Sequence, residues 1–501
     1  MDIFQNLFMG FSVATTTENL LMATLGAVLG FFVGAMPGIG SLAGVALLLP
    51  ITFKFNPVTA IIMLGALYYS NMFGGSYSSI LINVPGDSPA MMAALDGYPL
   101  ARKGKAIKAL MTSNISGFFG GFIGMTILVF LGPALATLGL KFGPAEMAAL
   151  MLVAMTSVSW LVGENPLKGI AAACIGILLG TMGVDSITGS VRYNFGSMYL
   201  MGGISFIPLV MGFFGISQVF ELAETRNEKP PQAIEGKMKL RDGLLTRHEF
   251  GRIIKPILRS GFLGAFVGFL PGAGATSATF LGYAMQKKFK SEEELGTGAI
   301  EGIAACETAD NAAAAGAFGP LLALGIPGSG TTAVLLGGLI MWGLNPGPML
   351  FTSEPEFAWG LIASLFISNW IALFIALLCI PMMSKVVRLP VGVLIPAIVT
   401  ICCAGSYATT SSLYGVVIML IGGVLGYLLI KNDYPVAPLL LAFVLSTSLE
   451  INVRRALVIS GGSISCFFTR PISLVLMLVF FALVLTPAVR GILSKIRARN
   501  R

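Results

Sequence analysis

Residues suited to binding a small organic anion gather beside four short breaks in an otherwise apolar chain. We call these breaks the first tip (residues 37–40), the second tip (83–86), the third tip (271–274) and the fourth tip (325–328); each contains the dipeptide Pro-Gly. Proline removes a backbone donor and glycine admits unusual backbone angles, so a helix should stop at each tip. The helix that starts after a tip then points unpaired N–H groups and its positive dipole end at a ligand.

Neutral donors next to the tips are of the kind that a carboxylate needs, and they avoid the cost of burying an arginine. The alternative is a set of proline-kinked helices whose glycines serve only close packing. The residues predicted to bind the anion are Gly38, Gly40 and Ser41; Asn83, Pro85, Gly86 and Ser88; Gly272, Gly274, Thr276 and Ser277; and Gly328, Ser329, Thr331 and Thr332.

Three acids lie in an alanine-rich stretch, where they could bind a coupling cation. Glu307 and Asp310 are three residues apart and share one helical face, whereas Glu301 lies near the start of the stretch. Acids at membrane depth often carry protons or bind cations, and sodium prefers hard oxygen ligands. We predict that Asn71, Asp310 and Asn311 bind the coupling cation, either sodium or a proton, and we expect no other metal or cofactor. The alternative for Glu301 and Glu307 is a solvated helix start near the cytoplasmic surface.

Two further acids, Asp87 and Asp96, are expected to cap helices beside turns. The only histidine, His248, lies in a charged segment and has no partner motif. The chain contains no nucleophile elbow, P-loop or HExxH motif, so we predict that it is not an enzyme. The six cysteines lie mostly in apolar stretches without metal-ligand spacing and are expected to be core residues.

The composition identifies the elements that must position these residues. Of 501 residues, 55% are hydrophobic and 11% are charged, and the mean hydropathy is +0.87. Soluble domains contain about 25% charged residues, so a soluble protein is excluded. Long apolar runs without period-two alternation predict an all-α polytopic membrane protein rather than a barrel. The net charge of +8 fits basic cytoplasmic loops better than nucleic-acid binding.

Basic clusters predict the topology. The charged segment 222–260 is expected to be a cytoplasmic linker, and about eleven crossings would connect an outside N-terminus to an inside C-terminus. Arg454, Arg455 and Arg470 then fall on the outside, against the rule. Either they form a patch that docks a partner or attracts anions, or the number of crossings is wrong.

The two sides of the linker resemble each other. Residues 29–40 align with residues 263–274 at a constant offset, with eight of twelve positions identical, and the second and fourth tips form a weaker pair. Because one copy is entered from outside and the other from the cytoplasm, the charges predict two inverted-topology repeats. We therefore expect a first membrane repeat at 1–221, the linker at 222–260 and a second repeat at 261–501. Re-entrant hairpins with Pro-Gly tips would meet at one site.

Several longer motifs resemble one family across nearly the whole chain. They are PGIGSLAGVALLLPITF (37–53), GGSYSSILINVPG (74–86), DGYPLARKGKA (96–106), PGAGATSA (271–278), residues 307–337 and RRALVISGGSISCFFTRPIS (454–473). Together they resemble the large permease subunit of tripartite tricarboxylate transporters.

The resemblance implies a multi-pass subunit of the bacterial inner membrane that imports carboxylates such as citrate with an ion gradient. It also implies two partners, a small membrane subunit and a periplasmic substrate-binding protein. Two other interpretations stay open. One is a stand-alone ion or anion exchanger that needs no binding protein, and the other is a channel or membrane scaffold without coupled transport.

Overall fold

The computed structural model describes residues 3–36, 39–162, 166–185, 187–224, 243–386 and 391–499. The structure is 81% helical, and its described strands form one short antiparallel pair. Eight of the described helices are long and apolar enough to cross a membrane, and shorter apolar helices accompany them. The prediction of an all-α polytopic membrane protein is therefore confirmed. The number of crossings and the boundaries of the two repeats stay predictions, and residues 225–242 of the linker lie outside the described residues.

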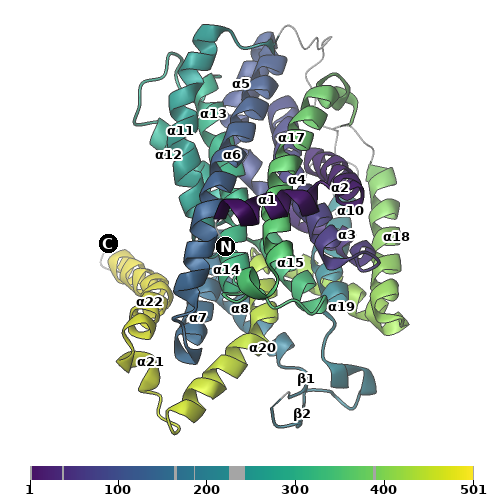
Figure 1. The fold of residues 1–501 in the computed structure, drawn as a ribbon, viewed down its shortest axis with the longest axis vertical. Coiled ribbons are helices and arrows are strands. Elements are labelled where there is room, and N and C mark those ends of the chain that lie inside the picture. Colours follow the sequence, from purple (N-terminus) through teal and green to yellow (C-terminus); the bar gives the residue numbers. More distant parts are fainter. Residues whose placement is uncertain are drawn as a thin grey trace.

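The chain forms its helices in two series, before and after the linker (Figure 1). The first series is α1 (Ile3–Ala14), α2 (Thr17–Ala35), α3 (Gly40–Thr52), α4 (Pro57–Ile82), η1 (Ser88–Ala90), α5 (Met91–Leu100), η2 (Ala101–Lys105), α6 (Ala106–Gly139), α7 (Pro144–Val162), α8 (Pro166–Gly180), β1 (Gly183–Val184), β2 (Val191–Arg192), η3 (Met198–Gly202), α9 (Phe206–Val210), η4 (Met211–Ile216) and α10 (Ser217–Glu224). The second is α11 (Arg247–Phe269), α12 (Gly274–Gln286), α13 (Ile300–Gly316), α14 (Phe318–Leu324), α15 (Gly330–Met341), α16 (Leu350–Ser353), α17 (Pro355–Val386), α18 (Val391–Thr410), α19 (Leu413–Lys431), α20 (Val436–Ile459), α21 (Cys466–Thr469) and α22 (Pro471–Arg499).

Helices stop at the tips because the backbone there leaves the right-handed region. α4 ends at Asn83 with φ 58°, and α14 ends at Gly325 with φ 67°. Asparagine and glycine are the residues that tolerate this left-handed conformation best. Across the third tip, α11 ends before Leu270 and α12 begins at Gly274, and the two helices pack side by side (Figure 1). The structure thus contains the hairpin that the Pro-Gly motif predicts.

The core of the molecule is built on close contacts to α13, in which every residue is buried. A Cβ atom added at Gly120 of α6 would lie 2.4 Å from the Thr308 carbonyl oxygen, and one at Gly264 of α11 would lie 2.4 Å from the Ala309 carbonyl oxygen. Glycines therefore let the backbones of α6 and α11 approach α13 on two sides. Close packing of small residues is how helices associate where lipid supplies no hydrophobic drive.

Candidate functional site

The tips meet through Ser41, the second residue of α3. Its backbone N–H donates to Asp87 Oδ2 at 2.8 Å, just after the second tip. Its hydroxyl lies 2.9 Å from the Thr331 hydroxyl in the first turn of α15, just after the fourth tip. Ser41 follows the first tip, and its two partners follow the second and fourth tips, 46 and 290 residues away in the chain. Gly40, which precedes it, is buried with φ 66°, and Gly38 lies outside the described residues.

The third tip joins the fourth through the backbone. The Gly274 N–H donates to the Gly328 carbonyl oxygen at 3.1 Å. Gly272 and Gly274 have φ of 78° and 62°, which a residue with a side chain rarely adopts. A helix outside the tips also supports this turn, because the Ser157 hydroxyl of α7 donates to the Pro271 carbonyl at 2.7 Å.

The fourth tip is followed by a capped helix start. The Ser329 hydroxyl accepts from the Thr332 N–H at 3.2 Å, and the Thr332 hydroxyl accepts from the Ser329 N–H at 2.8 Å. This reciprocal capping satisfies two backbone donors and fixes where α15 begins. The Tyr68 hydroxyl of α4 lies 3.4 Å from the Ser329 hydroxyl, so α4 also reaches the site.

The residues of the second tip differ in burial, since Gly86 is buried and Asn83 is exposed. A Cβ atom at Gly86 would lie 1.9 Å from the Gly34 carbonyl oxygen of α2, so only glycine fits. Pro85 is half-buried, whereas Asn83 and Ser88 are exposed. The Thr276 and Ser277 side chains, in the first turn of α12, are half-buried, and α12 packs against η1. Residues of the four tips, or directly after them, are therefore linked in one cluster.

The residues predicted to bind a cation are all deeply buried, but they face different neighbours. Asp310 is 1% exposed, and its Oδ1 atom has no hydrogen-bond partner among the described residues. It lies on α13, which packs against α12 and η1, the helices that follow the third and second tips. Neither amide atom of Asn71 has a described partner. The Asn311 amide nitrogen donates to the Glu307 carbonyl one turn earlier in α13 at 3.0 Å and lies against Gly117 of α6, and its Oδ1 atom has no partner among the described residues.

The alternative that Glu301 and Glu307 form a solvated helix start is wrong, because both side chains are buried. Arg252 of α11 binds both oxygens of Glu301, at 2.9 and 3.0 Å. The Ser76 hydroxyl of α4 lies 2.7 Å from both oxygens of Glu307. Each acid is satisfied by a partner on another helix, which replaces the water it would otherwise need.

Of the two acids expected to cap helices, Asp87 does so. It accepts from the Ser88 N–H at 2.8 Å as well as from Ser41. Asp96 instead lies inside α5 and accepts from the backbone N–H groups of Gly298 and Ala299, at 2.9 and 2.8 Å, in the turn before α13, so its predicted role as a helix cap is wrong. The contact between Asp87 and a second helix start was not foreseen from the sequence.

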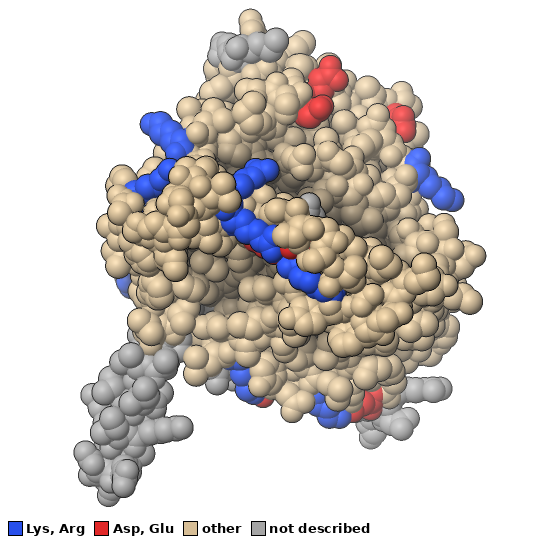
Figure 2. Space-filling view, turned by 90° about the horizontal axis from the view of Figure 1, so that it is seen from below, with Lys and Arg blue, Asp and Glu red and all other residues tan. Residues whose placement is uncertain are grey.

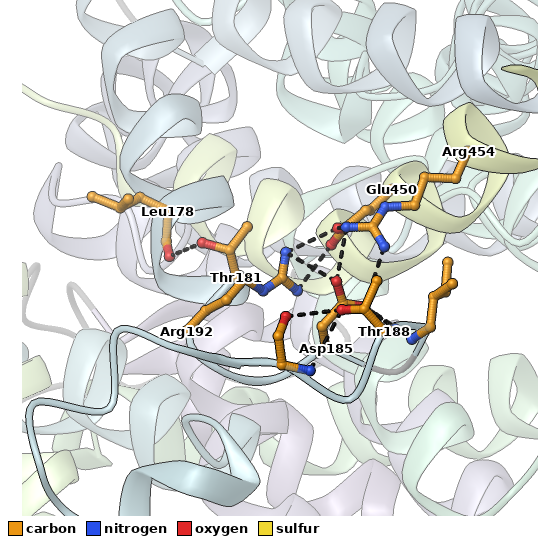
Figure 3. A network of polar contacts seen from close by, with 9 residues as sticks. Leu178, Thr181, Asp185, Thr188, Arg192, Glu450 and Arg454 are labelled. Atoms are coloured by element: carbon orange, nitrogen blue, oxygen red, sulfur yellow. Dashed lines mark hydrogen bonds and ion pairs between the residues drawn. The ribbon is translucent and has the colours of Figure 1, made fainter. Parts of the chain in front are cut away.

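A second polar cluster, which we call the outer network, lies at the other end of α15 from the tips (Figure 3). It consists of Asp185, Arg192, Glu450 and Arg454. Arg192 binds both oxygens of Glu450, at 2.9 and 3.2 Å, and Arg454 binds Asp185 at 2.8 Å. The backbone N–H of Ile187 and then the Arg454 guanidinium hold the pKa of Asp185 well below its ordinary value, although burial opposes them. These pairs fasten the β1–β2 hairpin to α20.

Ion pairs within the chain leave fewer free charges for the docking patch predicted at Arg454, Arg455 and Arg470. Arg454 binds Asp185 and Glu450, and Arg470 lies 3.3 Å from Glu146, so both charges are already paired. Arg455 is exposed. Seen from below, basic side chains cross the middle of this face beside a hollow (Figure 2).

A cavity of about 290 Å³ lies between the outer network and the last turn of α15. Arg192 and Glu450 line one side, and Ile340 and Met341 line another. Since α15 begins beside the fourth tip and ends at this cavity, one short helix connects the two polar regions. Sequence reasoning missed the pairs of Asp185 and Arg192 with α20, because they join residues 269 and 258 positions apart, although Glu450 and Arg454 pair within one helix.

Comparison with known proteins matches this chain to one family model and to two relatives. The model of the tripartite tricarboxylate transporter TctA family matches residues 20–441, so the resemblance seen in the motifs is confirmed. An uncharacterized 52.8 kDa protein in the TAR-I ttuC' 3'region of Agrobacterium vitis is 40% identical over 496 residues, which cover 99% of this chain and 98% of that protein. An uncharacterized protein in the TAR-II ttuC' 3'region of the same organism is 41% identical over 232 residues, 46% of this chain and 96% of that protein. No solved structure gives a significant match.

Proposed function

Because this chain belongs to the tripartite tricarboxylate transporter TctA family and is a multi-pass membrane transporter component, we propose that it is the large permease of a binding-protein-dependent importer. The substrates would be tricarboxylates or related organic carboxylates, and a sodium or proton gradient would drive their uptake. The bacterial inner membrane is the proposed location, and a small membrane subunit and a periplasmic substrate-binding protein are the proposed partners. We propose no catalytic role.

The observation that carries this proposal is the meeting of the four tips around Ser41. Hydroxyls, helix starts and glycine turns converge there, and none of the four tips contains Lys, Arg or His. Donors of this kind suit an anion that must bind and leave again, because the ligand does not form a buried ion pair with a fixed cation. Asn83 and Ser88, which are exposed, mark the proposed side of ligand entry.

Coupling to a cation is proposed at Asp310, with Asn71 as a neutral ligand. A buried carboxylate without a described cationic partner is costly, and a bound sodium ion or proton would remove that cost. The packing of α13 against α12 and η1 links this position to the tips. A cation bound at Asp310 would therefore lower the electrostatic repulsion between this residue and an incoming substrate carboxylate.

A stand-alone exchanger is the second candidate. It is favoured by the pairing of Arg454 and Arg470 with acids of this chain, which removes two of three charges available for docking an acidic partner.

The test is uptake of labelled citrate and of a panel of dicarboxylates into proteoliposomes, with the binding protein present or absent and with a sodium or a proton gradient. We expect uptake only with the binding protein and only with one gradient. Asp310→Asn should change the dependence on that cation, and an unchanged cation profile would move coupling elsewhere. Uptake without the binding protein would favour the exchanger, and accumulation against a gradient would exclude a channel.

A further inference from the structure

The helix starts at the tips are capped differently in the two series of helices. Asp87 lies four residues after the left-handed Asn83, and Ser329 lies four residues after the left-handed Gly325. The two residues thus occupy equivalent positions, each capping the helix that follows its tip. One cap is a carboxylate and the other is a neutral hydroxyl, so the site is asymmetric in charge.

Asp87 uses both carboxylate oxygens on helix starts. Oδ2 accepts from Ser41 of α3 and Oδ1 accepts from Ser88 of η1, each at 2.8 Å. Gly40 permits this approach, because a Cβ atom there would lie 3.1 Å from Oδ1. An anion of the chain itself therefore occupies the position that the start of α3 offers to a ligand.

Among the described residues, no carboxylate binds the corresponding helix starts in the second series. Gly274 of α12 donates to a carbonyl oxygen, and at the start of α15 the Ser329 and Thr332 hydroxyls accept from each other's backbone N–H. A second observation lies beside it: Asp310 of α13 is 1% exposed, its Oδ1 atom has no partner among the described residues, and α13 packs against η1 and α12. The Asp87 carboxylate thus stands on one side of the cluster, and neutral donors stand on the other.

We propose that Asp87 is a specificity-determining residue that limits how many carboxylate groups the site accepts. Its side chain fills the anion position at α3, and a substrate carboxylate is received at the starts of α12 and α15. A further carboxylate on the substrate would have to approach the negative side, where like charges repel. The inference rests on the proposed function, because it assumes that the ligand of the tips is an organic carboxylate.

The test measures binding to the purified full-length chain as thermal stabilisation by acetate, succinate and citrate at constant ionic strength and sodium concentration. Asp87→Asn keeps the shape and can still accept one of the two hydrogen bonds, but it removes the charge. We expect the ratio of citrate affinity to succinate affinity to rise by about tenfold or more. Asp87→Ser, which copies the cap of the second series, should change the ratio in the same direction and covers the case in which the asparagine variant does not fold.

Two control variants separate the effect of the charge itself from the effect of its position in the chain. Asp433→Asn removes an equal charge from a side chain that is 88% exposed, and it should leave the ratio unchanged. Asp87→Glu keeps the charge and should retain the ratio of the unmodified chain. If the aspartate and asparagine forms give the same ratio, or if only sodium dependence changes, the inference is overturned. If the unmodified chain responds to no carboxylate and transports none, the proposed function itself fails.

Discussion

The four tips and the outer network both gather polar groups, but they differ in how those groups are satisfied. In the outer network, two arginines and two acids bind one another and leave the hairpin fastened to α20. At the tips, backbone N–H groups, hydroxyls and one aspartate meet, while Asp310 and Asn71 keep atoms without described partners. Most polar groups of the outer network bind one another, although Arg192 Nε has no described partner, whereas the buried amide of Asn71 has no described partner at either atom. The comparison therefore fits a role of the outer network in folding, and ligand binding at the tips stays a prediction.

Breaking the geometry of a tip should have the largest effect. Gly272→Val places a side chain at a φ of 78°, and its Cβ atom would lie 2.4 Å from Val158 Cγ2 and 2.9 Å from the Val158 backbone nitrogen. The turn must then shift away from α7, so we expect carboxylate uptake to be abolished in proteoliposomes. The matched control is Gly251→Ala on α11, where a Cβ atom meets nothing within 4 Å. Normal uptake by the Gly272 variant would exclude the third tip from the site.

Removing one hydroxyl between the tips should have a smaller effect. Thr331→Val keeps the shape of the side chain but leaves the buried Ser41 hydroxyl without its partner at 2.9 Å. An unsatisfied buried hydroxyl costs about 1–3 kcal/mol, so we expect apparent substrate affinity to fall by roughly tenfold. Thr352→Val, at an exposed threonine, is the control. If Thr331→Val and Ser41→Ala have strictly additive effects, the two hydroxyls do not act together.

The outer network should respond in stability rather than in transport. Arg454→Gln leaves Asp185, which is 4% exposed, with one fewer cation. Since Arg454 is itself 34% exposed, solvent screening reduces the expected loss to about 1 kcal/mol of unfolding free energy. Thermal unfolding in detergent measures this loss. Arg455→Gln, at the adjacent exposed residue, should leave the melting temperature unchanged, and an equal loss in both variants would contradict a specific role of the network.

The smallest expected effect is a loss of unfolding free energy at low pH. The pKa of Asp185 is lower in the folded chain than its ordinary value of 3.8, so its ionised form stabilises the folded state. This contribution is fully present above about pH 4 and is lost as the pH falls through the lowered pKa. The difference in unfolding free energy between the unmodified chain and Asp185→Asn should therefore stay constant from pH 8 to about 5 and shrink in stronger acid. A difference that shrinks already between pH 8 and 6 would mean that another group controls the hairpin.

Local chemistry made the tips predictable from the sequence. Proline and glycine act on the backbone at the position where they occur, so the breaks at Asn83, Gly272 and Gly325 follow from residue type alone. The repeat of the motif then suggested that the breaks meet. The same reasoning could not show that Asp87 caps α3 as well as η1, because that contact depends on how the two segments pack.

The alternative of solvated side chains failed at Glu301 and Glu307, whose partners lie far away in the chain. Arg252 is 49 residues from Glu301, and Ser76 is 231 residues from Glu307, so nothing local distinguishes these buried acids from solvated ones. Asn311 follows Asp310 directly, yet one residue of an α-helix turns the side chain by about 100°, which is enough to direct it toward α6. Packing, rather than residue type, decides these cases.

The hydroxyl pair of Ser41 and Thr331 has a consequence for motion. It joins a helix of the first series to a helix of the second by one neutral hydrogen bond, which contributes only about 0.5–1.5 kcal/mol. Leu42 and Leu49 of α3 also pack against Gly330 and Gly338 of α15, so the hydroxyl pair is the polar part of a larger contact between the two series. A ligand that bridges α3 and α15 would strengthen this contact, so binding would also tighten the two series against each other.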